Sequence, residues 1–214
     1  AQDRWFQMAT NVTNIDGGAR GIFAGGDPSR DTNMDYITIS SKGNATDFGD
    51  YPISNGTGTR GIVANNTRGF IGGGESPSAG DSHNVIGKFE FASTGSAIDF
   101  ANLSWTSKGG AGLSNATRGI IAAGGTPGNA NTIEYITIAT TGNAVDFGDV
   151  NQGNEGASGT SSPTRGVIVG MKNPSTYNTI EYIEIATTGN AKDFGDLTEA
   201  KSHMGACSNA HGGL

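Results

Sequence analysis

One eight-residue phrase occurs four times in the chain, and this repetition constrains the fold more than any other feature. It reads GNATDFGD at 43–50, GSAIDFAN at 95–102, GNAVDFGD at 142–149 and GNAKDFGD at 189–196. Its phenylalanines are 52, 47 and 47 residues apart. A period in this range is typical of propellers, solenoids and other arrays, in which one unit cannot bury its apolar face without its neighbours. We therefore expect the 214 residues to form one domain of similar units.

Each unit is predicted to contain four β-strands. In the third unit, an apolar run closed by a glycine pair at 124–125 is typical of a buried strand followed by a sharp turn. Residues 131–140 are rich in β-branched and aromatic side chains, which predicts a second strand. A turn and a short strand around Phe147 follow. The remaining strand precedes the apolar run, and it is clearest as KSHMGACSN at 201–209 and recognisable at 4–11.

Four strands per unit, without a helical period, predict the antiparallel blade of a β-propeller. The blades are expected at 4–51, 52–104, 105–151 and 152–198, with residues 199–214 beginning a fifth. Two arrangements are open at this point. Either the last strand replaces or overlies the first strand of a four-bladed ring, or the chain is an excerpt of a longer propeller. The unpaired edges of an isolated half-blade favour the excerpt.

The unit resembles the kelch repeat. In that repeat a basic residue and often a histidine precede an apolar strand that ends in a glycine pair, and strands with a tyrosine and a further aromatic residue follow. Lys201 and His203 match its start, and glycine pairs stand at 25–26, 73–74 and 124–125, while the fourth pair is replaced by Gly170-Met171. The aromatic matches are Tyr36, Phe89, Tyr135 and Tyr182, then Phe48, Phe100, Phe147 and Phe194, where kelch units usually end in tryptophan. The resemblance implies an all-β, kelch-like propeller of four-stranded antiparallel blades.

The wording of the repeats, with TRG before an apolar strand and then NTIEYITIATTGNA and DFGD, is similar to kelch-like repeats in virion and tail-fibre-associated proteins of marine bacteriophages, especially those infecting cyanobacteria. This resemblance implies a non-catalytic structural or binding protein at the virion or another extracellular surface, which contributes to assembly or host attachment. The implied partners are other virion proteins or host-surface glycans, and an oligomer is compatible with this role. A cellular or secreted carbohydrate-binding propeller is an alternative, and an enzyme with an axial active site is a second.

Composition narrows the classes of partner. The net charge is −7 and the pI is near 4.8, which argues against a nucleic-acid partner because a phosphate backbone attracts basic proteins. No apolar run approaches the roughly 18 residues of a membrane helix, so we expect no membrane insertion. A single cysteine, Cys207, excludes an internal disulfide and a thiolate metal site.

An arginine followed by glycine recurs in every unit, and it has two interpretations. A ring of these arginines around an axis would suit a carboxylate or sulfated-glycan partner. Alternatively, each arginine joins the repeat to an acid of an adjacent blade or to carbonyl groups in its turn, as we predict. The residues assigned to such repeat-structural roles are Arg20, Arg68, Arg118 and Arg165, with Phe48, Phe100, Phe147 and Phe194.

The repeated acidic residues do not match a catalytic motif. Asn44, Asp47 and Asp50 recur at a spacing of three, which could gather oxygen ligands for calcium, although a strand would point the two acids to opposite faces. The D-F-G triplet lacks the glycine-rich loop, strand lysine and H-R-D loop of a kinase. We therefore predict a protein that is not an enzyme and has no cofactor, with calcium as the one alternative.

Loops differ between repeats more than strands do, so they are the better candidates for binding. The variable segments at 26–33, 74–84, 125–131 and 171–178 all follow the glycine-pair strand, which places them on one face of a ring. They are rich in Ser, Asn, Asp and Gly, which suits polar or carbohydrate ligands. The candidate binding residues are Asp27, Arg30, Asp31, Glu75, Asp81, His83, Asn129, Asn131, Lys172 and Tyr177.

Overall fold

The computed structural model describes residues 20–25, 32–52, 61–74, 82–107, 109–124, 131–152 and 155–209. Within these ranges the chain forms fifteen β-strands and no helix. The strands make four antiparallel sheets, of which the first has three strands and the others have four. The all-β, antiparallel prediction is confirmed. The strand predicted at 4–11 lies outside the described residues.

The strands follow one another in chain order through the four sheets. The first sheet contains β1 (Arg20–Ala24), β2 (Asn33–Thr38) and β3 (Thr46–Asp50). The second contains β4 (Gly61–Ala64), β5 (Arg68–Gly72), β6 (His83–Glu90) and β7 (Ile98–Ser107). The third contains β8 (Ala111–Ser114), β9 (Arg118–Ala122), β10 (Thr132–Thr137) and β11 (Val145–Asp149). The fourth contains β12 (Ser158–Ser161), β13 (Arg165–Val169), β14 (Thr179–Glu184) and β15 (Lys192–Asp196).

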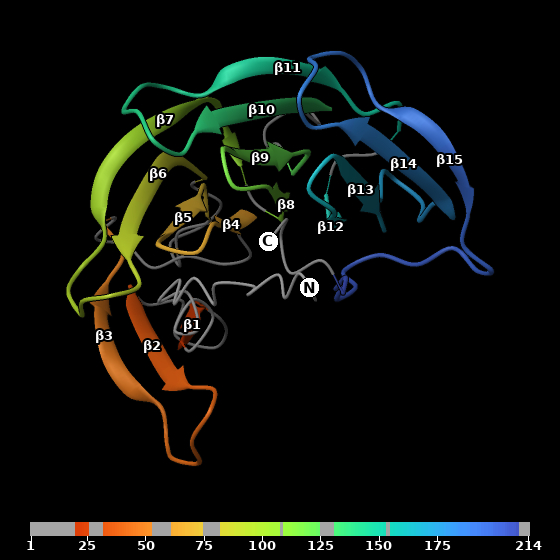
Figure 1. The fold of residues 1–214 in the computed structure, drawn as a ribbon. Helices are drawn as coiled ribbons and strands as arrows, with labels where there is room; N and C mark the ends of the chain where they lie inside the picture. Colours follow the sequence, from red (N-terminus) through yellow and green to blue (C-terminus); the bar gives the residue numbers. More distant parts are fainter. Residues whose placement is uncertain are drawn as a thin grey trace, which may run out of the picture.

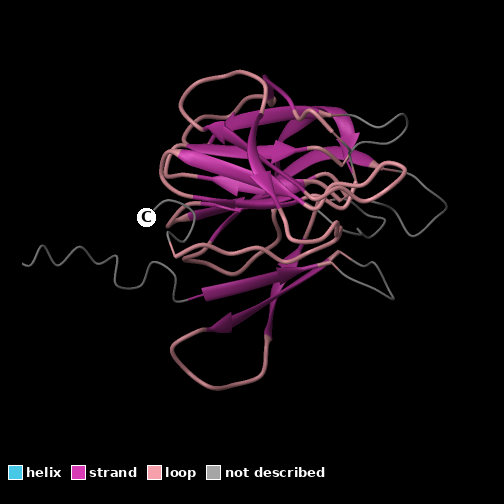
Figure 2. Cartoon of the chain, turned by 90° about the vertical axis from the view of Figure 1, so that its right-hand side faces the viewer, coloured by secondary structure: helices cyan, strands magenta, loops and turns pink. Residues whose placement is uncertain are grey.

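The sheets fan out around a common centre in a propeller-like arrangement (Figure 1). The short strands β4, β8 and β12 lie innermost, and β3, β7, β11 and β15 lie at the periphery. The view turned by 90° contains only strands and loops in the part that is described (Figure 2). Adjacent innermost strands contact each other, β4 with β8 and β8 with β12. The centre of the fan is therefore walled by consecutive sheets.

The apolar core is divided among the interfaces between successive sheets. Phe48 of β3 packs with Ile71 of β5 between the first and second sheets. Phe100 of β7 packs with Ile121 of β9 between the second and third, and Phe147 of β11 lies in one cluster with Ile168 of β13. We call each such interface a joint. Each cluster of buried apolar residues lies in a joint. A sheet therefore buries its apolar face only against a neighbouring sheet, as expected for a repeat protein.

The strand register corrects one match made from the sequence. Tyr36, Tyr135 and Tyr182 each lie opposite the second residue after the repeat arginine, and in the second sheet this position is Lys88, not Phe89. Successive strand residues point to opposite faces, so a shift of one reverses the side chain. Phe89 accordingly faces the first joint, with its ring centroid 5.5 Å from that of Phe48.

The segment KSHMGACSN at 201–209 is not a strand, which corrects a second prediction. It nevertheless runs beside β12, because the amide of His203 donates to the carbonyl of Gly156 at 2.9 Å and the hydroxyl of Ser208 donates to the carbonyl of Ser161 at 2.7 Å. Among the described residues no strand pairs with this segment. It therefore lacks the ladder of backbone hydrogen bonds that defines a strand.

Candidate functional site

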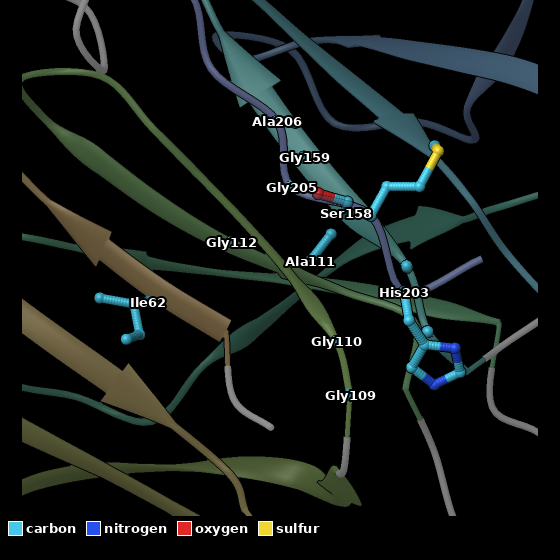
Figure 3. Close-up of a pocket in the computed structure, with 13 residues that line it drawn as sticks. Ile62, Gly109, Gly110, Ala111, Gly112, Ser158, Gly159, His203, Gly205 and Ala206 are labelled. Carbon is cyan, nitrogen blue, oxygen red and sulfur yellow. The ribbon is translucent and has the colours of Figure 1, made fainter. Parts of the chain in front are cut away.

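A cavity of about 530 Å³ lies at the centre of the fan. Its walls come from three consecutive innermost strands and from the C-terminal segment, as Figure 3 shows. Ile62 of β4, Gly112 of β8 and Gly159 of β12 contribute one side each, and His203 and Gly205 contribute the last. The cavity therefore exists only because the repeats are assembled.

Close approach between innermost strands explains why the cavity wall consists of very small residues. A Cβ atom on Gly112 would lie 2.2 Å from the carbonyl oxygen of Ile62. A Cβ atom on Gly159 would lie 2.4 Å from a methyl group of Leu113. Larger residues cannot stand at these positions without pushing the sheets apart, because real Cβ contacts never become so short. Along these strands the wall consequently presents backbone, small side chains and the exposed Ile62, and the segment 201–209 adds His203 and Met204.

His203 stands beside this cavity in an uncommon conformation. Its φ is +56°, in the left-handed region that residues other than glycine seldom adopt. Its ring lies over Gly156, where a Cβ atom would come within 2.7 Å of the imidazole. Its Nδ1 is 3.2 Å from the hydroxyl of Ser202, and the ring is exposed. Apart from His203, the lining residues carry no ionisable side chain.

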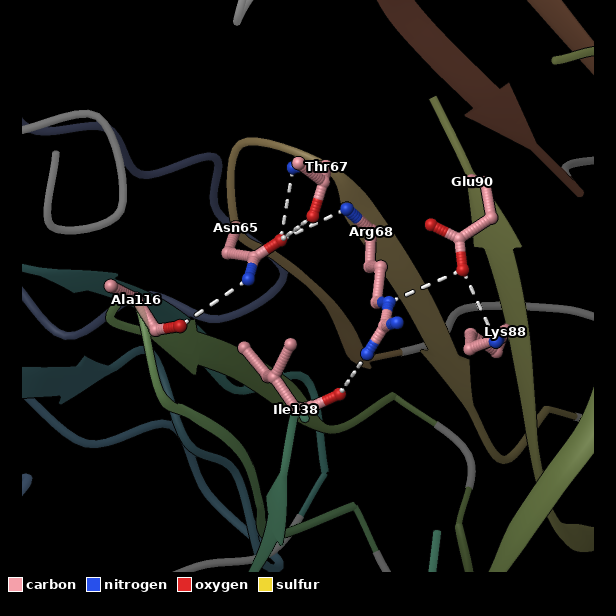
Figure 4. Close-up of polar contacts among 7 residues, drawn as sticks. All are labelled: Asn65, Thr67, Arg68, Lys88, Glu90, Ala116 and Ile138. Carbon is pink, nitrogen blue, oxygen red and sulfur yellow. Dashed lines mark hydrogen bonds and ion pairs between the residues drawn. The ribbon is translucent and has the colours of Figure 1, made fainter. Parts of the chain in front are cut away.

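Three of the four repeat arginines join successive sheets, and none of the four lines the cavity. The Nη1 of Arg68 donates to the carbonyl of Ile138 at 3.1 Å, while its Nε pairs with Glu90 at 3.2 Å, as Figure 4 shows. Arg20 and Arg118 donate to the equivalent carbonyls, those of Phe91 and Ile185, at 2.6 and 2.7 Å. This geometry favours the repeat-structural interpretation over a ring of arginines around the axis.

Each of three arginines also covers a tyrosine ring of its own sheet. The guanidinium carbon lies 5.0 Å from the ring of Tyr36 for Arg20, and 4.5 Å from that of Tyr135 for Arg118. Arg165 lies 4.6 Å from the ring of Tyr182 and forms an ion pair with Glu184 at 2.9 Å. The stacked ring holds the guanidinium plane in place. In Arg20 and Arg118 a further N–H group reaches the neighbouring sheet.

The repeat phenylalanines also lie between successive sheets, with one exception. Phe48, Phe100 and Phe147 are buried in the three joints. Phe194 holds the equivalent position in the fourth sheet, yet its side chain is 54% exposed. Its ring contacts Tyr182 of its own sheet, with centroids 6.0 Å apart. The difference arises because no further sheet follows β15 among the described residues.

Six of the ten candidate loop residues lie outside the described residues, and the structure does not gather the other four into one site. Those outside are Asp27, Arg30, Asp31, Glu75, Asp81 and Asn129. Asn131 donates to the carbonyl of Val150 at 3.3 Å, and Tyr177 donates its hydroxyl to Asn173 at 2.7 Å. The Nζ of Lys172 lies 4.0 Å from the Oε1 of Glu155. The Nε2 of His83 is buried and has no hydrogen-bond partner within the described part of the chain.

Two buried glutamates make hydrogen bonds across joints, and the sequence analysis did not predict this role for them. Glu134 of β10 accepts the amide of Ser104 at 3.0 Å, and Glu181 of β14 accepts the amide of Asn151 at 2.9 Å. Burial raises the pKa of the Glu181 carboxyl above its ordinary range, although the donors of Asn151 oppose the shift. The sequence Thr-Ile-Glu-Tyr-Ile occurs in both strands, and this repetition was the one sign in the sequence that the two glutamates share a role.

The second sheet replaces this acid–amide contact by a different pair. Gly87 stands where Glu134 and Glu181 stand, and it faces Pro52 and Tyr51 of the preceding repeat. A Cβ atom on Gly87 would lie 2.6 Å from the Tyr51 ring. Proline has no amide to donate, so a carboxylate here would lose its partner. The Tyr51 hydroxyl instead donates within the joint, with the carbonyl of Val85 at 2.7 Å.

The repeated aspartates serve turns and neighbours instead of gathering at one point. Asp47 and Asp193 each accept the amide two residues later at 3.0 Å, and Asp50 accepts the hydroxyl of Thr32 at 3.0 Å. No group of three or more His, Cys, Asp or Glu side chains placed to hold a metal ion occurs in the described ranges. Those ranges also contain no helix long and apolar enough to cross a membrane.

Comparisons with known proteins support the fold alone. No family model matches the chain, and no curated protein matches it. The solved structure described as "Structure of YjhT" is similar, with a TM-score of 0.67 and 10% sequence identity. The alignment covers 86% of this chain and 64% of that chain, so this chain spans less than two thirds of the similar protein. The fold defines an all-β protein with a propeller-like arrangement of antiparallel sheets.

Proposed function

We propose that this chain is part of a kelch-like β-propeller whose role is to bind a ligand, not to transform one. The observation that carries the proposal is the chemistry of the central cavity. Its lining contains no Asp, Glu or Cys side chain, whereas the charged residues of the repeat are engaged in joints and turns. A wall of backbone and small side chains offers amide and carbonyl groups in fixed positions, which favours recognition by shape and hydrogen bonds.

The proposed ligand is a neutral, hydroxyl-rich molecule such as an oligosaccharide of a host surface. Backbone groups and Ser158 can hydrogen-bond to hydroxyl groups, while Ile62 and Met204 offer apolar contact to a sugar face. The proposed setting is a fibre or surface decoration of a marine phage virion. The acidic composition and the phrase shared with virion-associated kelch-like repeats support that setting.

The experiment is a binding screen with neutral and sulfated oligosaccharides, followed by titration of any ligand found. Ala206→Trp should place an indole in the cavity and weaken binding by tenfold or more. Ala186→Trp is the matched control, because Ala186 is exposed outside the cavity lining. Equal binding by both variants would place the ligand elsewhere, and turnover of the ligand by the purified chain would contradict a binding role.

A further inference from the structure

The first and fourth sheets each contain a pocket of about 200 Å³ at the loop that joins their two outer strands. The loop of the first sheet spans residues 37–45 between β2 and β3, and it is wide instead of tight (Figure 1). The last cross-strand pair before the loop is Tyr36 with Thr46 in the first sheet and Tyr182 with Lys192 in the fourth. The two pockets therefore occupy the same place in the repeat, and we call them the hairpin pockets.

Neighbouring sheets do not fill this place in the repeat. The first sheet is followed by the second and the fourth is preceded by the third, yet both contain the pocket. In the second and third sheets, which have a neighbour on both sides, Ile98 and Val145 stand where Thr46 and Lys192 stand. Their side chains are still 57% and 51% exposed. The position therefore faces solvent when the sheets are assembled.

Polar groups that both donate and accept hydrogen bonds line the hairpin pocket of the first sheet. Its side chains include the hydroxyl groups of Tyr36, Thr38, Ser41 and Thr46 and the amide of Asn44. None of these side chains carries a charge at neutral pH. Such a lining is matched by a neutral ligand that itself offers both donors and acceptors.

The tyrosine of this pocket is held in a fixed orientation. The guanidinium carbon of Arg20 lies 5.0 Å from the centroid of the Tyr36 ring, and the Phe48 ring meets that ring edge-on with centroids 5.9 Å apart. Tyr36 nevertheless stays partly exposed. A fixed aromatic ring beside hydroxyl and amide groups can contact the C–H groups of a sugar while its neighbours bond the sugar hydroxyls.

We propose that the hairpin pockets at Tyr36 and Tyr182 each bind a single residue of a neutral sugar. Their volume lies below the roughly 300–1,000 Å³ of pockets for larger ligands, which limits the occupant to one sugar residue. They are separate from the central cavity, since no residue lines both. Two weak sites on one rigid chain strengthen attachment to a glycan surface through multivalency.

The pocket of the fourth sheet fits the same class of ligand. Glu184 and Lys192 add one charge of each sign to its lining, so the lining has no net charge. The amide of Asp149 donates to the Oδ1 of Asn190 at 3.1 Å. The Oδ1 is thereby used in the joint, which holds Asn190 in place and leaves its Nδ2 group to donate to a sugar hydroxyl.

The two middle sheets lack part of this arrangement. In the second sheet, Lys88 replaces the tyrosine, and its Nζ pairs with Glu90 at 3.2 Å. The third sheet keeps Tyr135, but the residue opposite is the apolar Val145. We therefore expect two bound sugar residues per chain, one at each hairpin pocket.

The test is an NMR titration of the full, isotope-labelled chain with the methyl glycosides of glucose, galactose, mannose and N-acetylglucosamine. At least one of these should shift the amide signals of Gly43 and Gly189, which line the two pockets. Thr46→Tyr fills the first pocket and should weaken the Gly43 response at least tenfold without changing that of Gly189. Lys192→Tyr should do the reverse.

Ile98→Tyr is the matched control, because it places the same side chain at the same repeat position in the sheet that lacks the tyrosine. Both responses should persist in this variant. Should Thr46→Tyr fail to fold, Asn44→Ala removes the amide of the first pocket without adding bulk and should weaken the Gly43 response at least threefold.

Responses that survive both pocket-filling variants would overturn the proposal, as would the absence of a response at both loops for all four sugars. Shifts confined to Gly112 and Gly159 would mean that sugars bind at the central cavity alone, which overturns the hairpin pockets and supports the central site. Shifts at Gly43 and Gly189 without any at the central cavity would support the hairpin pockets even though the central site had failed.

Discussion

The hydroxyl of Ser161 donates to the carbonyl of Ser114 at 2.8 Å, across the joint between the third and fourth sheets. The same contact occurs one repeat earlier, where Ser114 donates to Ala64 at 2.8 Å, and one repeat later, where Ser208 donates to Ser161 at 2.7 Å. This ladder links the innermost strands β4, β8 and β12 and the segment 201–209. It places Ser208, and with it the segment 201–209, where the innermost strand of a following sheet would lie.

Ser161→Ala should lower the free energy of unfolding by about 1–3 kcal/mol, because it removes the hydroxyl that donates to the Ser114 carbonyl and accepts the Ser114 amide. Denaturant unfolding monitored by circular dichroism measures the change. Ser175→Ala is the matched control, since Ser175 is exposed in a loop, and it should be within about 0.5 kcal/mol of the unaltered chain. Equal effects would mean that the ladder contributes nothing.

Arg118→Ala should destabilise the fold by about 2–3 kcal/mol through loss of a charged hydrogen bond to Ile185 and of the contact with Tyr135. Arg165→Ala should cost about 1 kcal/mol or less, because Arg165 also covers a tyrosine ring but donates to no neighbouring sheet, and its ion pair with Glu184 is exposed. Thermal unfolding of both variants at low protein concentration checks the difference. A ring of arginines that binds anions predicts another result, in which Arg118→Ala weakens sulfate binding and leaves stability unchanged.

Phe147→Ala should cost about 3–5 kcal/mol, as is usual for a buried aromatic side chain. Phe194→Ala should cost less than about 1 kcal/mol in the monomer, because that ring is largely exposed. The two residues share one sequence context, so the comparison isolates the effect of the neighbouring sheet. Measured costs that agree within error would show that burial between sheets is not what distinguishes them.

Glu181 should give the stability a pH dependence with a definite sign. Because its pKa is raised in the folded protein, the folded state binds more protons than the unfolded state between the ordinary glutamate pKa of about 4.3 and the raised value. The free energy of unfolding therefore contains a contribution that decreases as pH rises through this window and is constant above it. Glu181→Gln keeps an acceptor for Asn151 and should remove that contribution.

Urea titrations of the unaltered chain and of Glu181→Gln from pH 4 upward measure the difference in unfolding free energy at each pH. The stability of the unaltered chain relative to the variant should fall as pH rises. A relative stability that instead rises with pH would mean that the pKa of Glu181 is lowered, and that the amides of Asn151 outweigh the cost of burial.

The local sequence pattern was sufficient to predict the strands, but it did not predict which groups their side chains contact. The glycine pairs, β-branched runs and the period of the phenylalanines predicted antiparallel strands, and the structure has them. The match of Phe89 to the repeat tyrosines was wrong by one position, because aromatic identity does not specify which face a strand residue occupies. The cavity was not foreseen, since its wall consists mainly of glycine, alanine and serine from segments that are far apart in sequence.

The amino-acid sequence by itself determined the repeating unit, since the strand-forming residues and the turn glycines of each unit lie within about 50 residues of one another. Only the tertiary structure decided which group each repeated side chain meets. Arg68 reaches a carbonyl 70 residues away, and Phe147 and Phe194 differ in burial although their local sequences are nearly the same. Burial depends on the sheet that lies alongside, and no local pattern states whether such a neighbour is present.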